Sequence, residues 1–162
     1  MGDRIAALPF FVILMGLGSL AMLVPAAHGA IVEDFVTMRV FFYGFILFSI
    51  LTLMIGLATA GYTPRSVARS QLVGLLAAFS ALPIMFAIPF YEAVGNTTFL
   101  NAWFEMVSSF TTTGATVYDT AGRLTPSQHL WRGLVGWMGG FLVILSAVAV
   151  LAPMTLGGFE VL

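Results

Sequence analysis

The chain has 162 residues, of which 60% are hydrophobic and 8% charged, with six arginines, seven acidic residues and neither lysine nor cysteine. Water-soluble domains carry about 25% charged residues, so this chain has too few to cover a surface in water. Its near-neutral charge excludes a nucleic-acid-binding surface, and the lack of cysteine excludes disulfides, cysteine-ligated zinc and thiol chemistry. A multi-span membrane protein is the class that remains.

Long uncharged stretches predict four membrane spans. Four gaps between charged residues hold 28, 25, 22 and 27 residues, and each exceeds the roughly 20 residues that cross the hydrocarbon core. In chain order we place spans at residues 5–27, 38–60, 67–90 and 129–152. The first lacks the positive flank and the short apolar core of a cleaved signal peptide, so we expect it to be retained.

The segment between the third and fourth spans is too short to cross the membrane. The uncharged gaps on either side of Glu105 hold only 12 and 13 residues. Thr98 is a good N-cap for a short helix over residues 99–110, which would be about 18 Å long. The run Thr-Thr-Thr-Gly-Ala-Thr at 111–116 then ends that helix, because β-branched residues and glycine are poor helix formers.

The predicted elements follow the order of a pore unit in ion channels. The third span corresponds to an outer helix, the short helix to a pore helix, the threonine–glycine stretch to a selectivity filter and the fourth span to an inner helix. We therefore predict an all-α transmembrane fold with four membrane-spanning helices and, between the third and fourth, a re-entrant pore helix with a filter loop. Residues 1–63 would form two N-terminal transmembrane helices, and residues 64–162 one outer helix–pore loop–inner helix unit.

The threonine–glycine stretch has the chemistry of a cation filter. The negative end of the short helix favours a cation, and extended residues after it can offer carbonyl oxygens that replace an ion's hydration shell. Gly114 permits the dihedral angles that turn successive carbonyls to one side. The predicted ion-binding carbonyls are those of Thr112, Thr113, Gly114 and Ala115, flanked by Thr111 and Thr116. The alternative is that the stretch is an ordinary external loop.

Two charged residues are candidates for supporting this filter. Glu105 lies on the short helix, where an acid at membrane depth is a functional candidate by default; a solvated position at the rim is the alternative. Arg132 either pairs with Glu105 or extends to the outer interface beside Trp131. His28 and His129 have no second ligand at metal spacing, so the only metal expected is K⁺ at the filter. No catalytic constellation is present, and we expect no enzyme.

Several ordered strings of residues resemble the Trk/Ktr/HKT superfamily of potassium transporters, and most of all its TrkH-type membrane subunits. They are Phe104-Glu105-Met106-Val107-Ser108-Ser109-Phe110-Thr111-Thr112-Thr113-Gly114-Ala115, His129-Leu130-Trp131-Arg132, Gly136-Trp137-Met138-Gly139-Gly140 and Leu151-Ala152-Pro153 with Gly157-Gly158. The TrkH branch has two extra helices before its first pore unit, which the first two predicted spans fit. Within the third string, Gly136, Gly139 and Gly140 also provide a small face for close helix packing.

The resemblance implies potassium uptake by the ion-translocating subunit of a Trk-type system in the cytoplasmic (inner) membrane. It implies an N-terminus in the cytoplasm, a filter near the outer face centred on Gly114, K⁺ as the transported ion and no cofactor. The implied partners are the lipid bilayer, the remaining pore units and a cytoplasmic nucleotide-binding regulatory subunit, with no nucleic acid.

The chain departs from the family in its number of pore units, since the family builds one pore from four units in a single chain. We therefore expect the sequence to be an N-terminal fragment, or four copies to assemble a symmetric cation channel. The other alternative is a non-transporting membrane protein with an assembly or insertion role. The charges do not decide the orientation, because each side would receive three arginines.

Overall fold

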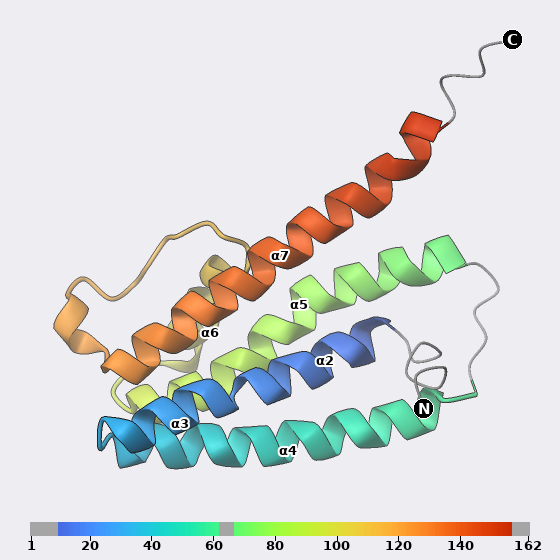
Figure 1. Ribbon diagram of the computed structural model, residues 1–162. Coiled ribbons are helices and arrows are strands. Elements are labelled where there is room, and N and C mark those ends of the chain that lie inside the picture. Colours follow the sequence, from blue (N-terminus) through green and yellow to red (C-terminus); the bar gives the residue numbers. More distant parts are fainter. Residues whose placement is uncertain (1–9, 62–66, 157–162) are drawn as a thin grey trace, which may run out of the picture.

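A computed structural model describes residues 10–61 and 67–156 of the chain, and all its regular elements are helices (Figure 1). In chain order they are α2 (Phe10–Ala21), α3 (Leu23–Ile31), α4 (Phe35–Thr59), α5 (Val67–Val94), α6 (Phe99–Phe110), the short 3-10 helix η1 (Ala121–Arg123) and α7 (Pro126–Leu156). The predicted all-α fold class is confirmed for these residues.

Four helical segments are long and apolar enough to cross a membrane, as the charge gaps predict. They are Phe10–Ile31, Phe35–Thr59, Leu72–Val94 and Pro126–Val148. Their outer surfaces carry many exposed apolar side chains, for example Leu53 and Leu57 on α4. Such side chains are stable against lipid tails, and the spans therefore imply a bilayer around the protein.

The first span is broken into α2 and α3 at Met22, whereas the uncharged gap predicted one continuous helix. The cause is Pro25, which has no N–H to donate to the carbonyl of Ala21 and whose ring crowds that carbonyl. The regular α2 helix accordingly ends at Ala21. The combined span runs on to Ile31, beyond the predicted end at residue 27, and the predicted residues 5–9 lie outside the described part.

The other helix ends also differ from the predicted ones. α4 begins at Phe35 instead of residue 38, α5 continues to Val94 through Pro83 and Pro89, and α7 begins at Pro126 instead of residue 129. Pro153, which we expected to close the last span, lies inside α7. A proline within a membrane helix is tolerated where neighbouring groups satisfy the freed carbonyls, so it is a weak end signal.

Aromatic side chains form the centre of the helix bundle. The ring of Trp131 on α7 is fully buried and meets Phe41 of α4 and Phe86 of α5 edge-on, at centroid distances of 5.1 and 5.4 Å. Its indole N–H donates to the Phe86 carbonyl. Trp131 is thus a core residue that joins three helices.

Polar contacts join the two leading spans to the later helices at one end of the bundle. The His28 ring on α3 shares a 2.9 Å hydrogen bond with the Ser127 hydroxyl on α7. The Gln128 amide donates to the Ala93 carbonyl of α5 (2.9 Å) and to the Thr37 hydroxyl of α4 (3.4 Å). The α3–α4 turn and the start of α7 therefore lie together, at the end opposite to the C-terminal part of α7 (Figure 1).

Candidate functional site

The short helix α6 packs against both α5 and α7. Thr98 is its N-cap, with the Asn101 N–H donating to the threonine hydroxyl at 3.2 Å, as predicted. The face toward the bundle buries Glu105 and Ser108 among apolar residues, whereas Leu100, on another face, is exposed. Two polar side chains thus enter the interior from a 12-residue helix.

The chain leaves α6 through a Schellman motif rather than through an extended strand. The Thr112 N–H donates to the Ser109 carbonyl at 3.0 Å, and the Thr113 N–H donates to the Ser108 carbonyl at 2.9 Å. This motif needs a left-handed residue at its centre, a place that glycine usually takes. Here it is Thr112, with φ of 57°. A β-branched residue in this conformation is strained, and such strain gathers at functional sites.

Gly114 is the second residue of this loop with a positive φ, at 76°. A Cβ added at Gly114 would meet no atom within 4 Å, so the glycine is required by its backbone conformation and not by lack of space. Its N–H lies 3.4 Å from the Ser108 carbonyl, which also accepts from Thr113.

Ser108 forms hydrogen bonds with three of the four residues of the predicted filter, Thr113, Gly114 and Ala115. Besides its carbonyl, its hydroxyl donates to the Ala115 carbonyl at 2.6 Å. Nothing in the predicted filter string singled this serine out. The available signal is its position three residues after Glu105, which places both polar side chains on one face of the helix.

The carbonyl oxygens of Thr112, Thr113 and Gly114 accept no hydrogen bond from any residue that the structure describes. The carbonyl oxygens on either side of these three are paired. The Thr111 carbonyl accepts from the Thr112 hydroxyl at 2.7 Å, and the Ala115 carbonyl accepts from the Ser108 hydroxyl. The side chains of residues 111–117 are all exposed. Three successive carbonyls at an exposed loop are therefore available to an external ligand, and Ala115 keeps a second lone pair.

Glu105 and Arg132 form an ion pair behind this loop, through Glu105 Oε1 and an Arg132 terminal nitrogen. The carboxylate is fully buried, and its other oxygen accepts from the Thr116 hydroxyl (3.1 Å) and the Val117 N–H (3.2 Å). One side chain thus ties α6 to α7 and to the far side of the loop. Glu105 is therefore buried and not solvated at a rim, and Arg132 pairs with it instead of extending away from it.

A glycine face of α7 receives the end of α6. A Cβ at Gly139 would overlap the Phe110 carbonyl, and Cβ atoms at Gly136 and Gly140 would lie 3.4 Å from the Ser109 carbonyl and 3.3 Å from a Thr112 methyl. The close packing predicted for these glycines is confirmed. Because the backbones approach so closely, α7 determines where the loop after α6 begins.

The outer part of the loop is fastened to the α5–α6 connection. The Tyr118 hydroxyl shares a 3.1 Å hydrogen bond with the Thr97 hydroxyl, and Arg123 donates to the Asn96 carbonyl. Burial raises the pKa of the Tyr118 hydroxyl, and the bond with Thr97 offsets part of that rise. Tyr118 therefore stays neutral at ordinary pH and serves as a fixed hydrogen-bonding group.

No group of three or more His, Cys, Asp or Glu side chains that could hold a metal is found within residues 10–61 and 67–156. His28, which we took as isolated, contacts Ser127 across the bundle. That contact spans 99 positions of the sequence, and local spacing carries no signal for it.

The helices and the loop together define a multi-span α-helical membrane protein whose third and fourth spans are joined through a short packed helix. No protein-family model matches the chain. Among curated proteins, it is 33% identical over 85 residues to the Trk system potassium uptake protein TrkI of Halomonas elongata. It is 39% identical over 84 residues to TrkG of Escherichia coli K12, and each match covers 52% of this chain.

An uncharacterized cation transporter of Methanocaldococcus jannaschii is 32% identical over 83 residues, or 51% of this chain. In all three comparisons the match covers 16% of the relative's length. No solved structure matches. The chain is a distant relative of the Trk-system potassium uptake proteins over about half its length. The relatives are named as uptake proteins and a transporter, in agreement with the expectation that the chain is not an enzyme.

Proposed function

We propose that this chain supplies one pore unit of a potassium-translocating membrane subunit. In this proposal α6 is a re-entrant pore helix, and the carbonyls of residues 112–115 line a K⁺ filter. The observation that carries it is the row of carbonyls at Thr112, Thr113 and Gly114, directly after the C-terminus of α6, that accept no hydrogen bond from the described residues. The names of the distant relatives support K⁺ as the ion.

In this proposal the loop binds the ion, and buried side chains of α6 and α7 hold the loop in place. The negative C-terminal end of α6 favours a cation nearby, and the free carbonyls replace its hydration shell. Glu105, paired with Arg132, and Ser108 hold the loop from behind, so that the carbonyls keep their places when an ion leaves. The filter loop itself is uncharged, which lets a monovalent cation bind weakly enough to pass on.

A complete pore needs further units, from the same longer chain or from other copies. We place the N-terminus in the cytoplasm and the α3–α4 turn and the start of α7 at the outer face of the cytoplasmic membrane. A nucleotide-binding regulatory subunit on the cytoplasmic side is part of the same proposal.

The filter is tested by Gly114→Ala in the chain joined to the pore units it needs, in cells that lack other potassium uptake. A side chain at φ of 76° is strained, so we expect K⁺ uptake or its discrimination against Na⁺ to fall at least tenfold. Gly122→Ala is the matched control, because Gly122 has neither a positive φ nor a neighbour within 4 Å of its Cβ position. Unchanged uptake and selectivity in Gly114→Ala would refute the filter.

Cysteine labelling distinguishes a filter from an ordinary loop, since the chain has no cysteine of its own. In the complete assembly, Thr113→Cys should react slowly with a water-soluble maleimide, and K⁺ should slow it further. Rapid labelling that K⁺ does not affect would favour the non-transporting alternative. Cross-linking of the chain expressed alone into tetramers, with K⁺ flux, would favour the symmetric channel.

A further inference from the structure

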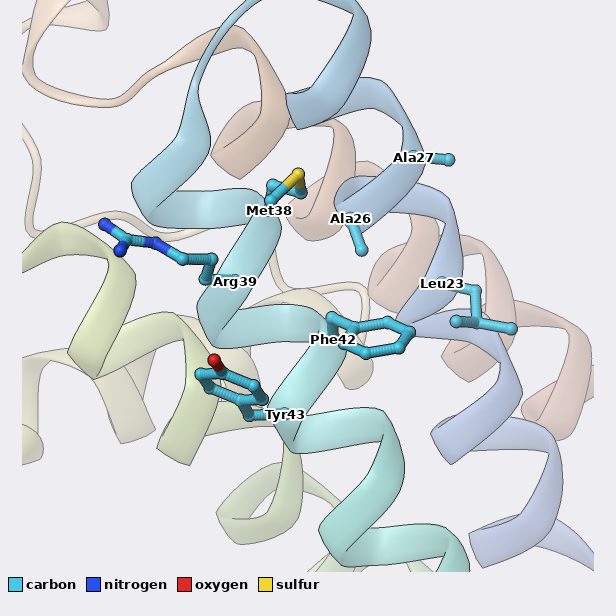
Figure 2. Close-up of a pocket in the computed structure, with 7 residues that line it drawn as sticks. All are labelled: Leu23, Ala26, Ala27, Met38, Arg39, Phe42 and Tyr43. Carbon is cyan, nitrogen blue, oxygen red and sulfur yellow. The ribbon is translucent and has the colours of Figure 1, made fainter.

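An open apolar groove is lined by residues of α3 and α4 (Figure 2). Its volume is about 540 Å³. Leu23 and Ala27 of α3 line one side, and Met38 and Phe42 of α4 line the other. Ala26, whose side chain lies nearest Phe42 in Figure 2, also lines the groove, and the small side chains of both alanines leave it open.

Two polar side chains at the rim of this groove have nitrogen or oxygen atoms without a partner in the described part of the chain. The Nε–H of Arg39 donates to the Phe35 carbonyl at 3.2 Å, but its terminal nitrogens have no partner in the described part of the chain. The Tyr43 hydroxyl, one helical turn later, has no partner among the described residues either. Both side chains project from α4 to the same side (Figure 2). The groove thus combines an apolar floor with a free cation and a free hydroxyl.

Arg39 lies near the N-terminal end of α4, a candidate membrane span. It is four residues after the first residue of the helix, or about 6 Å below the helix end. A long arginine side chain near the end of a spanning helix extends its charged group toward the lipid headgroups. Farther along α4, Ile46 and Leu47 are exposed apolar residues that continue the hydrocarbon-facing surface.

We propose that this groove binds one anionic phospholipid. The phosphate oxygens accept hydrogen bonds from Arg39 and Tyr43, and one acyl chain lies along Leu23, Ala27 and Phe42. A second copy of the chain or a further pore unit is a poorer occupant, because an apolar protein surface would bury the Arg39 charge without neutralising it. A lipid phosphate neutralises it through charge-assisted hydrogen bonds. The proposal does not depend on ion transport.

Tryptophan quenching in vesicles tests the site on the full chain. Phe42→Trp places a fluorophore in the groove, and the vesicles contain acyl-brominated phosphatidylglycerol or acyl-brominated phosphatidylcholine as a minor component. The signal of the unsubstituted chain is subtracted. We expect about fivefold tighter association of phosphatidylglycerol than of phosphatidylcholine, the preference that one arginine gives near an anionic surface. Leu53→Trp, exposed farther along α4, should be quenched equally by both lipids.

The Arg39→Gln variant in the Phe42→Trp background should abolish the preference for phosphatidylglycerol. Arg123→Gln is the control and should leave that preference intact, because it removes an exposed arginine from the outer part of the filter loop. Arg39→Lys should retain part of it and serves if Arg39→Gln does not fold. Free inorganic phosphate should not displace the lipid, because it has no acyl chain. Equal quenching by both lipids, or a preference that survives Arg39→Gln, overturns the proposal. So does protection from quenching that grows with protein concentration, which would indicate a second copy in the groove.

Discussion

The turn between α3 and α4 and the loop after α6 leave their helices in the same way. In the turn, the Asp34 N–H donates to the Gly29 carbonyl at 2.8 Å, and Glu33 between them has φ of 60°. In the loop, the Thr113 N–H donates to the Ser108 carbonyl at 2.9 Å, and Thr112 has φ of 57°. Both are Schellman-type ends with a residue other than glycine in the left-handed position.

The two segments differ in the course of the chain beyond this shared motif. In the turn, Asp34 immediately caps α4 by accepting from the Thr37 N–H at 3.1 Å, so the chain is helical again within three residues. Residues 111–125 after α6 contain only one short 3-10 helix. That loop keeps its shape through buried side chains of α6, namely Glu105 and Ser108. The same kind of helix end therefore serves a self-sufficient turn in one place and an externally supported loop in the other.

The largest effect should come from breaking the support of the loop. Glu105→Gln leaves Arg132 without its counter-ion in the interior, and we expect the free energy of unfolding to fall by about 3–5 kcal/mol. Chemical denaturation in detergent micelles, followed by circular dichroism, measures it. Glu33→Gln in the α3–α4 turn is the control and should change stability little.

A double variant sharpens that result. Combining Glu105→Gln with Arg132→Met should recover part of the loss, because no unpaired charge is then buried. If the double variant is as unstable as the sum of the single ones, the ion pair is not what holds the loop.

The next largest effect concerns the glycine face that positions the end of α6. Gly139→Ala would push its methyl group into the Phe110 carbonyl, and we expect a loss of about 1–3 kcal/mol as α6 and α7 separate. Gly133→Ala, on the same helix with no neighbour within 4 Å, should be neutral or slightly stabilising. Thermal unfolding of both variants checks this, and equal melting temperatures would contradict the close packing.

The two left-handed residues give a smaller and opposite effect. Thr112→Gly and Glu33→Gly each relieve the steric penalty of a positive φ, and we expect a gain of about 1 kcal/mol in each. The gain should be larger at Thr112, because its side chain is β-branched. If the strain serves the filter, only Thr112→Gly should also reduce K⁺ uptake in the complete assembly. Equal uptake by both variants would show that the strain has no role there.

The smallest effect is a pH dependence confined to the α3–α4 turn. Burial alone would raise the pKa of the Asp34 carboxyl, but hydrogen bonds from Thr125 and Thr37 hold it below its usual 3.8. A lowered pKa stabilises the fold above pH 3.8, and this stabilisation is lost as pH falls through the lowered value. The side chain is only partly buried, so the change should stay below about 1 kcal/mol.

Hydrogen exchange of the Thr37 amide measures this effect locally. Its protection should fall at acid pH in the unsubstituted chain. Asp34→Asn should keep the cap and lose the pH dependence, whereas Asp34→Ala should lose the protection at every pH. A pH dependence that persists in Asp34→Asn would assign it to another group.

Much of the fold could be predicted because it depends on local composition. The lengths of the uncharged gaps predicted the four spans, Thr98 marked the start of α6, and the spacing of Gly136, Gly139 and Gly140 predicted a close helix contact. The exact helix ends were less predictable, since Pro25 breaks a span while Pro83, Pro89 and Pro153 do not end theirs.

In the candidate site, too, the local features could be predicted from the sequence and the contacts between helices could not. The amino-acid order was enough to place a threonine–glycine run after a short helix between two spans, because apolar length and residue propensity are local properties. The packing of the helices was needed to bury Glu105 and to pair it with Arg132. The ion pair joins residues 27 positions apart on different helices, and such partners are chosen by how helices pack and by the need to pair a buried charge.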